Sequence, residues 1–107
     1  MKFLKTLRYF FFLLNSFKGV ECAFPYEYSK EDLTNAKTDE LEQVLINTDP
    51  GSTLGYAALV GHEDKFITSL EKSIEYCNAL KCKRLHIMSG RLEDNITGIA
   101  NIIFFMQ

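Results

Sequence analysis

The chain has 107 residues, which makes one domain at most on the usual range of about 100–200 residues per domain. Hydrophobic residues make up 47% and charged residues 24% of the sequence, a balance typical of globular rather than disordered proteins. Because the formal net charge is -2, no basic field exists to attract a phosphate backbone, and we expect no nucleic-acid partner. The three cysteines show no CxxC spacing, which argues against a disulfide framework and a closed zinc site and is typical of reduced thiols in the cytosol.

Residues 1–16 form an atypical segment, in which a basic start precedes an apolar run from Tyr9 to Leu14. The pattern has the outline of a signal peptide, but the run is shorter than the usual ~7–15 residues and no small-x-small cleavage site follows. It is also far shorter than the roughly 20 apolar residues that a membrane span needs. We therefore expect a cytoplasmic protein without a membrane-spanning segment, and secretion with residues 1–16 as a signal peptide stays open as the alternative.

The first half of the conventional region predicts a strand, a helix and a second strand. Apolar residues alternate over Val20–Phe24 until a proline, which cannot continue a central strand. Ser29 is a candidate N-cap for a helix that we expect to run to about Leu41, because acidic residues suited to the first turn follow it. Residues 43–48 are rich in β-branched side chains and end at the turn signal Asp49-Pro50-Gly51.

The second half predicts the clearest helix of the chain and a third strand. This helix begins at Glu63, and apolar residues recur along it at offsets of three and four. Residues 84–89 then form a short strand closed by Gly90, and a final helix beyond Ile96 is left open. The predicted apolar stripe of the helix consists of Phe66, Leu70, Ile74, Cys77 and Leu80 or Lys81.

The order strand, helix, strand, helix, strand predicts an α/β fold, because such alternation favours a parallel sheet with right-handed crossovers. A closed eight-stranded (β/α) barrel needs about 250 residues, so we expect three parallel strands with intervening helices, open rather than closed. Three regions are predicted: an N-terminal segment over 1–16, a partial barrel over 17–94 and an apolar tail over 95–107.

Three motifs in this order resemble one enzyme family. Residues 17–26 (FKGVECAFPY) are similar to the "GFxxVExxxPY" stretch of hydroxypyruvate isomerases, which forms their second strand. Residues 44–51 (VLINTDPG) resemble that family's "VLINTPPGD", and residues 84–91 (RLHIMSGR) resemble its "IHxMAGR". The resemblance covers residues 17–94 and implies the second to fourth βα units of a sugar-isomerase (xylose isomerase-like) TIM barrel. Residues 1–16 and 95–107 do not match, which predicts a truncated product.

The resemblance also implies an activity and the residues that it requires. The family converts hydroxypyruvate to 2-hydroxy-3-oxopropanoate by moving a proton between adjacent carbons, which calls for an acid and a base. In the family these are two Glu residues, assisted by a divalent cation that polarises the carbonyl group. Both Glu residues and the metal ligands lie on strands after the fourth, so no position of this sequence inherits a catalytic or metal-binding role. We expect a chain that is inactive alone, with no cofactor of its own.

Three polar residues could still line such a pocket, because strand residues alternate between the barrel interior and the helical layer. Glu21, Asn47 and His86 fall on the interior side, and Asn47 lies near the carboxyl end of its strand, where barrel active sites form. They are either substrate-pocket residues or satisfied polar residues of the interior, and both interpretations stay open. The same alternation assigns Ala23, Leu45 and Met88 to the interior, and Val20, Cys22, Phe24, Val44, Ile46, Leu85 and Ile87 to the helical layer.

Other motifs are weaker. His62-Glu63 begins like the zinc-protease signature HExxH, but Phe66 occupies the position of the second histidine. The function hypotheses are therefore an isomerase-family protein with a small 2-oxo or hydroxy acid as substrate, and a non-catalytic fragment that acts by binding a partner. For the isolated chain we also expect self-association through exposed apolar surface.

Overall fold

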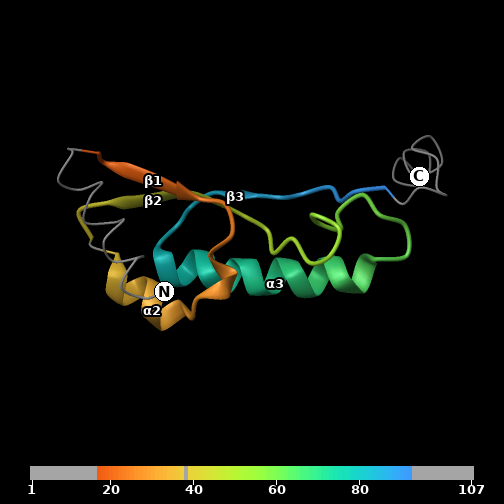
Figure 1. Cartoon of the computed structure of the whole chain (residues 1–107), viewed down its shortest axis with the longest axis horizontal. Helices are drawn as coiled ribbons and strands as arrows, with labels where there is room; N and C mark the ends of the chain where they lie inside the picture. The colour runs from red at the N-terminus through yellow and green to blue at the C-terminus, as the bar shows by residue number, and fades with distance from the viewer. Residues whose placement is uncertain (1–16, 38, 93–107) are drawn as a thin grey trace.

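The computed structural model describes residues 17–37 and 39–92, so the predictions for residues 1–16 and 95–107 lie outside the described residues. Three parallel strands form one sheet in the order β1 (Gly19–Cys22), β2 (Glu42–Asn47) and β3 (Leu85–His86). The helices α2 (Lys30–Ala36) and α3 (Glu63–Leu80) lie together on one side of this sheet (Figure 1). The predicted open α/β arrangement is thereby confirmed.

The pairing of β1 with β2 contains an irregularity that changes one assignment. Val20 pairs with Gln43 and Glu21 with Leu45, so Val44 has no partner in β1. Gln43 is 1% exposed, and its Nε2 donates to the backbone oxygen of Val20 at 3.4 Å. We expected Val44 in the helical layer, but it is only half-buried. Val44 is the extra residue of β2, and Gln43 instead lies opposite Val20.

Helix α2 begins where the sequence predicts and ends earlier. The hydroxyl of Ser29 accepts a hydrogen bond from the backbone N–H of Asp32 at 3.0 Å, which satisfies one of the donors at the helix N-terminus. The helix stops at Ala36, because Lys37 adopts an extended conformation with φ -83° and ψ 137°. The prediction that this helix reaches Leu41 is wrong, and Leu41 instead is buried beside Val20 and Ala36 in a small cluster.

Helix α3 has the predicted bounds, but part of its predicted stripe is wrong. Ile74 is 46% exposed, whereas Ser73 is fully buried and donates to the backbone oxygen of Ser69 at 2.6 Å. Ile74 follows the buried Ser73 by one residue, which turns its side chain about 100° around the helix axis and away from the buried face. The side chains of α3 that are buried are Ser69, Ser73, Tyr76, Cys77 and Leu80.

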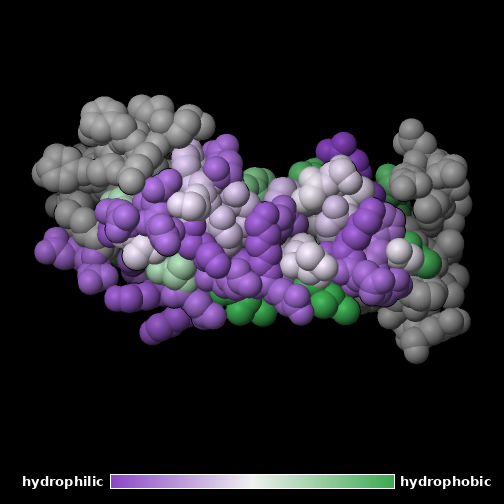
Figure 2. Space-filling view, turned by 90° about the horizontal axis from the view of Figure 1, so that it is seen from below, coloured by the Kyte–Doolittle hydropathy of each residue, from purple (hydrophilic) through white to green (hydrophobic). Residues whose placement is uncertain are grey.

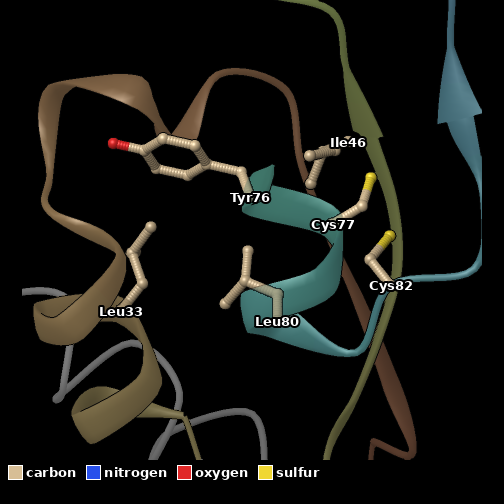
Figure 3. Close-up of a cluster of buried hydrophobic side chains, with 6 residues drawn as sticks. All are labelled: Leu33, Ile46, Tyr76, Cys77, Leu80 and Cys82. Carbon is tan, nitrogen blue, oxygen red and sulfur yellow. The ribbon is translucent and has the colours of Figure 1, made fainter. Parts of the chain in front are cut away.

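The main core lies between the two helices and β2. Leu33 of α2 and Ile46 of β2 are both fully buried, and side chains from the second half of α3 fill the space between them. Figure 3 shows this cluster, which consists of Leu33, Ile46, Tyr76, Cys77, Leu80 and Cys82.

Strand β3 is shorter than the predicted residues 84–89, because the chain changes partner after His86. The N–H of Met88 donates to the Thr48 hydroxyl at 3.1 Å, and Ser89 forms an antiparallel bridge with Gly55 in the loop before α3. Ile87, which we expected in the helical layer, is 48% exposed.

The outer face of the helices is mainly hydrophilic, with a few hydrophobic patches (Figure 2). Ile67 is 52% exposed and, with Ile74 seven residues later, lies on one stripe of α3. Among residues 17–37 and 39–92, no helix is both long enough and apolar enough to cross a membrane.

Candidate functional site

The candidate site lies where β2 and β3 end. Asn47 is the last residue of β2 and His86 the last of β3, and the register pairs the two residues directly. The Oδ1 atom of Asn47 lies 3.1 Å from Nδ1 of His86, a hydrogen bond in which the imidazole donates. Because carboxyl ends of parallel strands are where barrel enzymes place their active sites, this pair stands at the expected edge of the sheet.

Glu21 lies on the same face of the sheet but further back. It pairs with Leu45, two residues before Asn47, and successive side chains of a strand alternate between faces. Its side chain is exposed, as is His86, whereas Asn47 is half-buried. The structure thus places all three sequence-predicted residues on one face and brings Asn47 and His86 into contact; their role in a pocket stays a prediction.

Tyr26 supports this edge from the helix side, and the alternation pattern did not identify it. Its hydroxyl donates to the backbone oxygen of Asn47, and its ring meets that of Tyr76 edge-on, with centroids 4.9 Å apart. Nζ of Lys72 lies 5.4 Å from the Tyr26 ring centroid. Burial raises the pKa of the Tyr26 phenol to about 12, and a hydrogen bond with Ser73 opposes this only in part. The only sequence signal for Tyr26 is its place at the end of the first family motif.

Asp49 follows β2 and is held by three hydrogen bonds. Its carboxylate accepts from Nζ of Lys72 at 2.9 Å and from the N–H of Gly51 at 3.2 Å, and its own N–H donates to the Ser73 hydroxyl at 3.0 Å. Burial works to raise the pKa of Asp49, but the hydrogen bonds from Lys72 and Gly51 outweigh it and leave that pKa below its ordinary value. These contacts fix the turn after β2 against α3.

The loop between Gly51 and Gly61 packs along the chain that follows β3. The backbone N–H of Ala58 donates to the oxygen of Ser89 at 2.8 Å, and that of Arg91 donates to Thr53 at 2.6 Å. A groove of about 390 Å³ lies between this loop and α3, lined by Asp49, Tyr56 and Lys72 among others. Neither Asn47 nor His86 lines this groove, so it is separate from the candidate site.

The described residues do not fit the divalent cation that the family resemblance implies. Within residues 17–37 and 39–92, no group of three or more His, Cys, Asp or Glu side chains is placed to hold a metal ion. What Asn47 and His86 offer is an amide and an imidazole, both able to hydrogen-bond carbonyl and hydroxyl oxygens.

Fold and site together define a segment of a parallel (β/α) barrel, with polar residues at the carboxyl ends of adjacent strands. Comparisons with known proteins agree. A crystal structure of an AP endonuclease, family 2, from Brucella melitensis matches 94% of this chain and 41% of its own length, with a TM-score of 0.82 and 30% identity. That neighbour has a xylose isomerase-like TIM-barrel fold.

The chain is similar to hydroxypyruvate isomerases. Relatives with that name are 42% identical over 81 residues in Danio rerio, 37% over 91 residues in Homo sapiens and 32% over 80 residues in Escherichia coli. These matches cover 71%, 80% and 70% of this chain. They cover 29%, 33% and 31% of the relatives, so the chain spans about a third of their length. No family model matches the chain. The resemblance predicted from the three motifs is confirmed for this segment.

Proposed function

We propose that residues 17–92 form one side of the substrate pocket of a hydroxypyruvate isomerase-type barrel, which binds a small 2-oxo or hydroxy acid. The observation that carries this proposal is the 3.1 Å contact between Asn47 and His86 at the carboxyl ends of adjacent parallel strands. In this role the two side chains hydrogen-bond substrate oxygens, while Tyr26 fixes the strand end that carries Asn47. Glu21 lies on the same face and extends the polar lining from Asn47 toward the amino ends of the strands.

The proposed reaction is the conversion of hydroxypyruvate to 2-hydroxy-3-oxopropanoate, in which a proton moves between adjacent carbons. The resemblance assigns the acid and the base to two Glu residues that match no position in residues 1–107. A positioned acid or base typically contributes 10²–10⁴-fold to the rate. We therefore propose that the 107-residue chain contributes binding residues and does not turn over hydroxypyruvate alone.

The two histidines of the chain allow a direct test of binding. His86 lies in the candidate site, whereas His62 stands at the start of α3 with its ring stacked on Tyr56 at 5.7 Å. In NMR spectra of the full chain, hydroxypyruvate should shift the ring signals of His86 saturably and leave those of His62 unchanged. Asn47→Ala should abolish the His86 response. Equal shifts of both rings, or none at roughly 10 mM, well above typical KM values, would contradict the proposal.

Turnover is measured separately, with magnesium or manganese added and with protein free of host isomerase. We expect no product above the buffer rate. Metal-dependent turnover that follows the protein concentration would show that the chain holds its own acid and base, and the inactivity part of the proposal would then be wrong.

The second candidate function is partner binding without catalysis, and apolar exposure at the sheet margin favours it. Phe24, Ile87 and Leu92 are 38%, 48% and 42% exposed, although two of them occupy positions that a barrel covers with helices. This function would be supported if hydroxypyruvate does not shift the ring signals of His86 and a stable complex with a partner forms through these residues.

Localisation belongs to the proposal as well. We propose a cytoplasmic protein that keeps residues 1–16. Peptide mapping of the protein purified from its cells should recover residues 1–16 still attached, and secreted material starting near residues 17–20 would support the signal-peptide alternative.

A further inference from the structure

Two cysteines occupy a motif that brings their side chains together at the end of α3. The helix ends at Leu80, and Lys81 takes the left-handed conformation with φ 55° and ψ 34°. The N–H of Cys82 then donates to the backbone oxygen of Cys77 at 2.8 Å, and that of Lys81 donates to Asn78 at 3.3 Å. These two bonds define a Schellman cap, in which the side chains at the positions of Cys77 and Cys82 contact one another.

The surroundings of the pair agree with this geometry. Cys77 and Cys82 are each 8% exposed and carry free thiols. Figure 3 shows their sulfur atoms next to one another beside β2. Burial raises the pKa of Cys77 to about 11, and the neighbouring thiol of Cys82 adds to the rise. Sγ of Cys82 also donates to the backbone oxygen of Arg84 at 3.2 Å.

We propose that Cys77 and Cys82 form a reversible disulfide, a modification site built into the C-terminal cap of α3. The oxidant is a low-molecular-weight disulfide such as oxidised glutathione. One cysteine thiolate attacks this disulfide, forms a mixed disulfide and releases one small thiolate. The second cysteine thiolate then attacks the protein sulfur of the mixed disulfide and displaces the second small thiolate. Two protein thiols are oxidised, one small disulfide is reduced, and the two protons go to the released thiolates.

The position of this link connects it to the candidate site. Cys82 stands three residues before Leu85, the first residue of β3, and His86 ends that strand. A covalent bond across the cap adds to the two backbone hydrogen bonds of the Schellman cap and restricts opening of the α3–β3 connection. Because both thiols are shielded from solvent, oxidation should be slow. Because the cap already holds the two side chains together, the new bond should leave the core packing in place.

The experiment incubates the full 107-residue chain with a series of oxidised-to-reduced glutathione ratios, in native buffer and in concentrated guanidinium chloride. After acid quenching, alkylation and proteolysis, mass spectrometry identifies each cross-link. In native buffer we expect the 77–82 link as the dominant product, two hydrogen atoms lighter than the dithiol and lost on reduction. In denaturant, links that include Cys22 should appear as well, since the fold no longer selects the pair.

Two variants complete the test. Cys22→Ala should leave the native link unchanged, whereas Cys82→Ala should abolish it, and neither result requires the variant to be as stable as the parent chain. The oxidised chain should also show slower amide exchange at residues 81–86 than the reduced chain. Full alkylation of Cys77 and Cys82 at every glutathione ratio, or the same cross-link distribution in native and denaturing buffer, would overturn the proposal.

Discussion

Tyr26 connects the candidate site to the helical core through two parts of its side chain. The hydroxyl donates to the backbone oxygen of Asn47, and the ring packs edge-on against Tyr76 of α3. Substitution by Phe keeps the ring contact and leaves the Asn47 oxygen without its donor. Removing one partner of a part-buried hydrogen bond typically costs about 1–3 kcal/mol. We expect Tyr26→Phe to lower the free energy of unfolding near the bottom of this range, as measured by urea denaturation.

The same variant should change how stability depends on alkaline pH. The pKa of Tyr26 is about 12 in the folded chain against an ordinary 10.0, so the folded state keeps a proton that the unfolded state releases. The associated stability is complete below pH 10 and is lost as the pH rises toward 12. Tyr26→Phe should therefore flatten the profile in that window. Burial of Cys77 gives an earlier loss, between pH 9 and 11, which both proteins should share. Parallel profiles up to pH 12 would contradict the assignment to Tyr26.

Asp49 makes the opposite prediction at acid pH. Its pKa lies below the ordinary 3.8, because hydrogen bonds from Lys72 and Gly51 outweigh burial. The carboxylate therefore contributes stability that is present above pH 3.8 and is lost as the pH falls below it. Asp49→Asn should lower the free energy of unfolding at neutral pH by roughly 0.5–1 kcal/mol and reduce its loss toward acid pH.

The control for this variant is Asp39→Asn. Asp39 pairs with Lys81 at 3.2 Å, but both side chains are at least 75% exposed, so water screens the pair. We expect no measurable change in its acid unfolding profile. If the two variants have the same acid unfolding profile, the partial burial of Asp49 has no energetic effect. The prediction that the turn after β2 stabilises the fold would then be wrong.

At the scale of elements, local signals located the beginnings of the helices, whereas a tertiary contact decided the end of β3. Ser29 caps α2 through its own hydroxyl, a contact within one turn that the sequence displays directly. Strand β3 stops after His86 because the following residues pair with the loop around Gly55, more than thirty positions earlier in the chain. The site divides in the same way: alternation along the strands predicted the face of Asn47 and His86, whereas the Tyr26 contact depends on how the chain folds back after β1.

This loop-to-strand pairing predicts different outcomes for two glycines. Both have positive φ, +106° at Gly55 and +82° at Gly61, so alanine is strained at either position by roughly 1 kcal/mol. A Cβ atom at Gly55 would lie 2.3 Å from the backbone oxygen of Met88, whereas one at Gly61 meets nothing within 4 Å. Gly55→Ala should therefore cost an additional ~1–3 kcal/mol in the free energy of unfolding.

Amide NMR spectra provide a second measurement for the same pair of variants. Gly55→Ala should move the signals of Met88, Ser89 and neighbouring residues, because the alanine methyl group displaces the segment after β3 from the loop. Gly61→Ala should leave those signals in place. Equal destabilisation by both variants, with unchanged Met88 and Ser89 signals, would show that the loop does not hold the segment after β3.

For the whole molecule, the feature that determines stability is a parallel sheet with helices on only one side (Figure 1). Parallel sheets normally have both faces covered. In a closed barrel, the side chains of the opposite strands cover the inner face of the sheet. Within residues 17–37 and 39–92, no helix or strand covers the face that carries Glu21 and His86, and both side chains are exposed. Apolar residues also remain exposed on α3 and at the sheet margin, namely Phe24, Ile67, Ile74, Ile87 and Leu92.

We expect the isolated 107-residue chain to be marginally stable and to self-associate. Burial of apolar surface stabilises by about 25 cal/mol per Å². Contacts between copies that cover the exposed side chains can therefore contribute a free energy comparable to the ~5–15 kcal/mol of unfolding of an ordinary domain. Association of folded chains makes the thermal midpoint depend on protein concentration. Calorimetry at increasing concentration should therefore give a broad transition whose midpoint shifts, and sedimentation velocity should show species heavier than the monomer.

A pair of substitutions on α3 tests which surface associates. Ile67→Lys with Ile74→Lys places two charges on the exposed apolar stripe and should lower the heavier species without unfolding the chain, because neither side chain belongs to the core clusters. Lys65→Glu with Glu71→Lys changes exposed charges on the same helix and keeps the stripe, so its association should match that of the parent chain. A concentration-independent, cooperative transition above about 50 °C from a proven monomer would contradict the prediction, because typical mesophile domains unfold at about 45–65 °C with their cores fully covered.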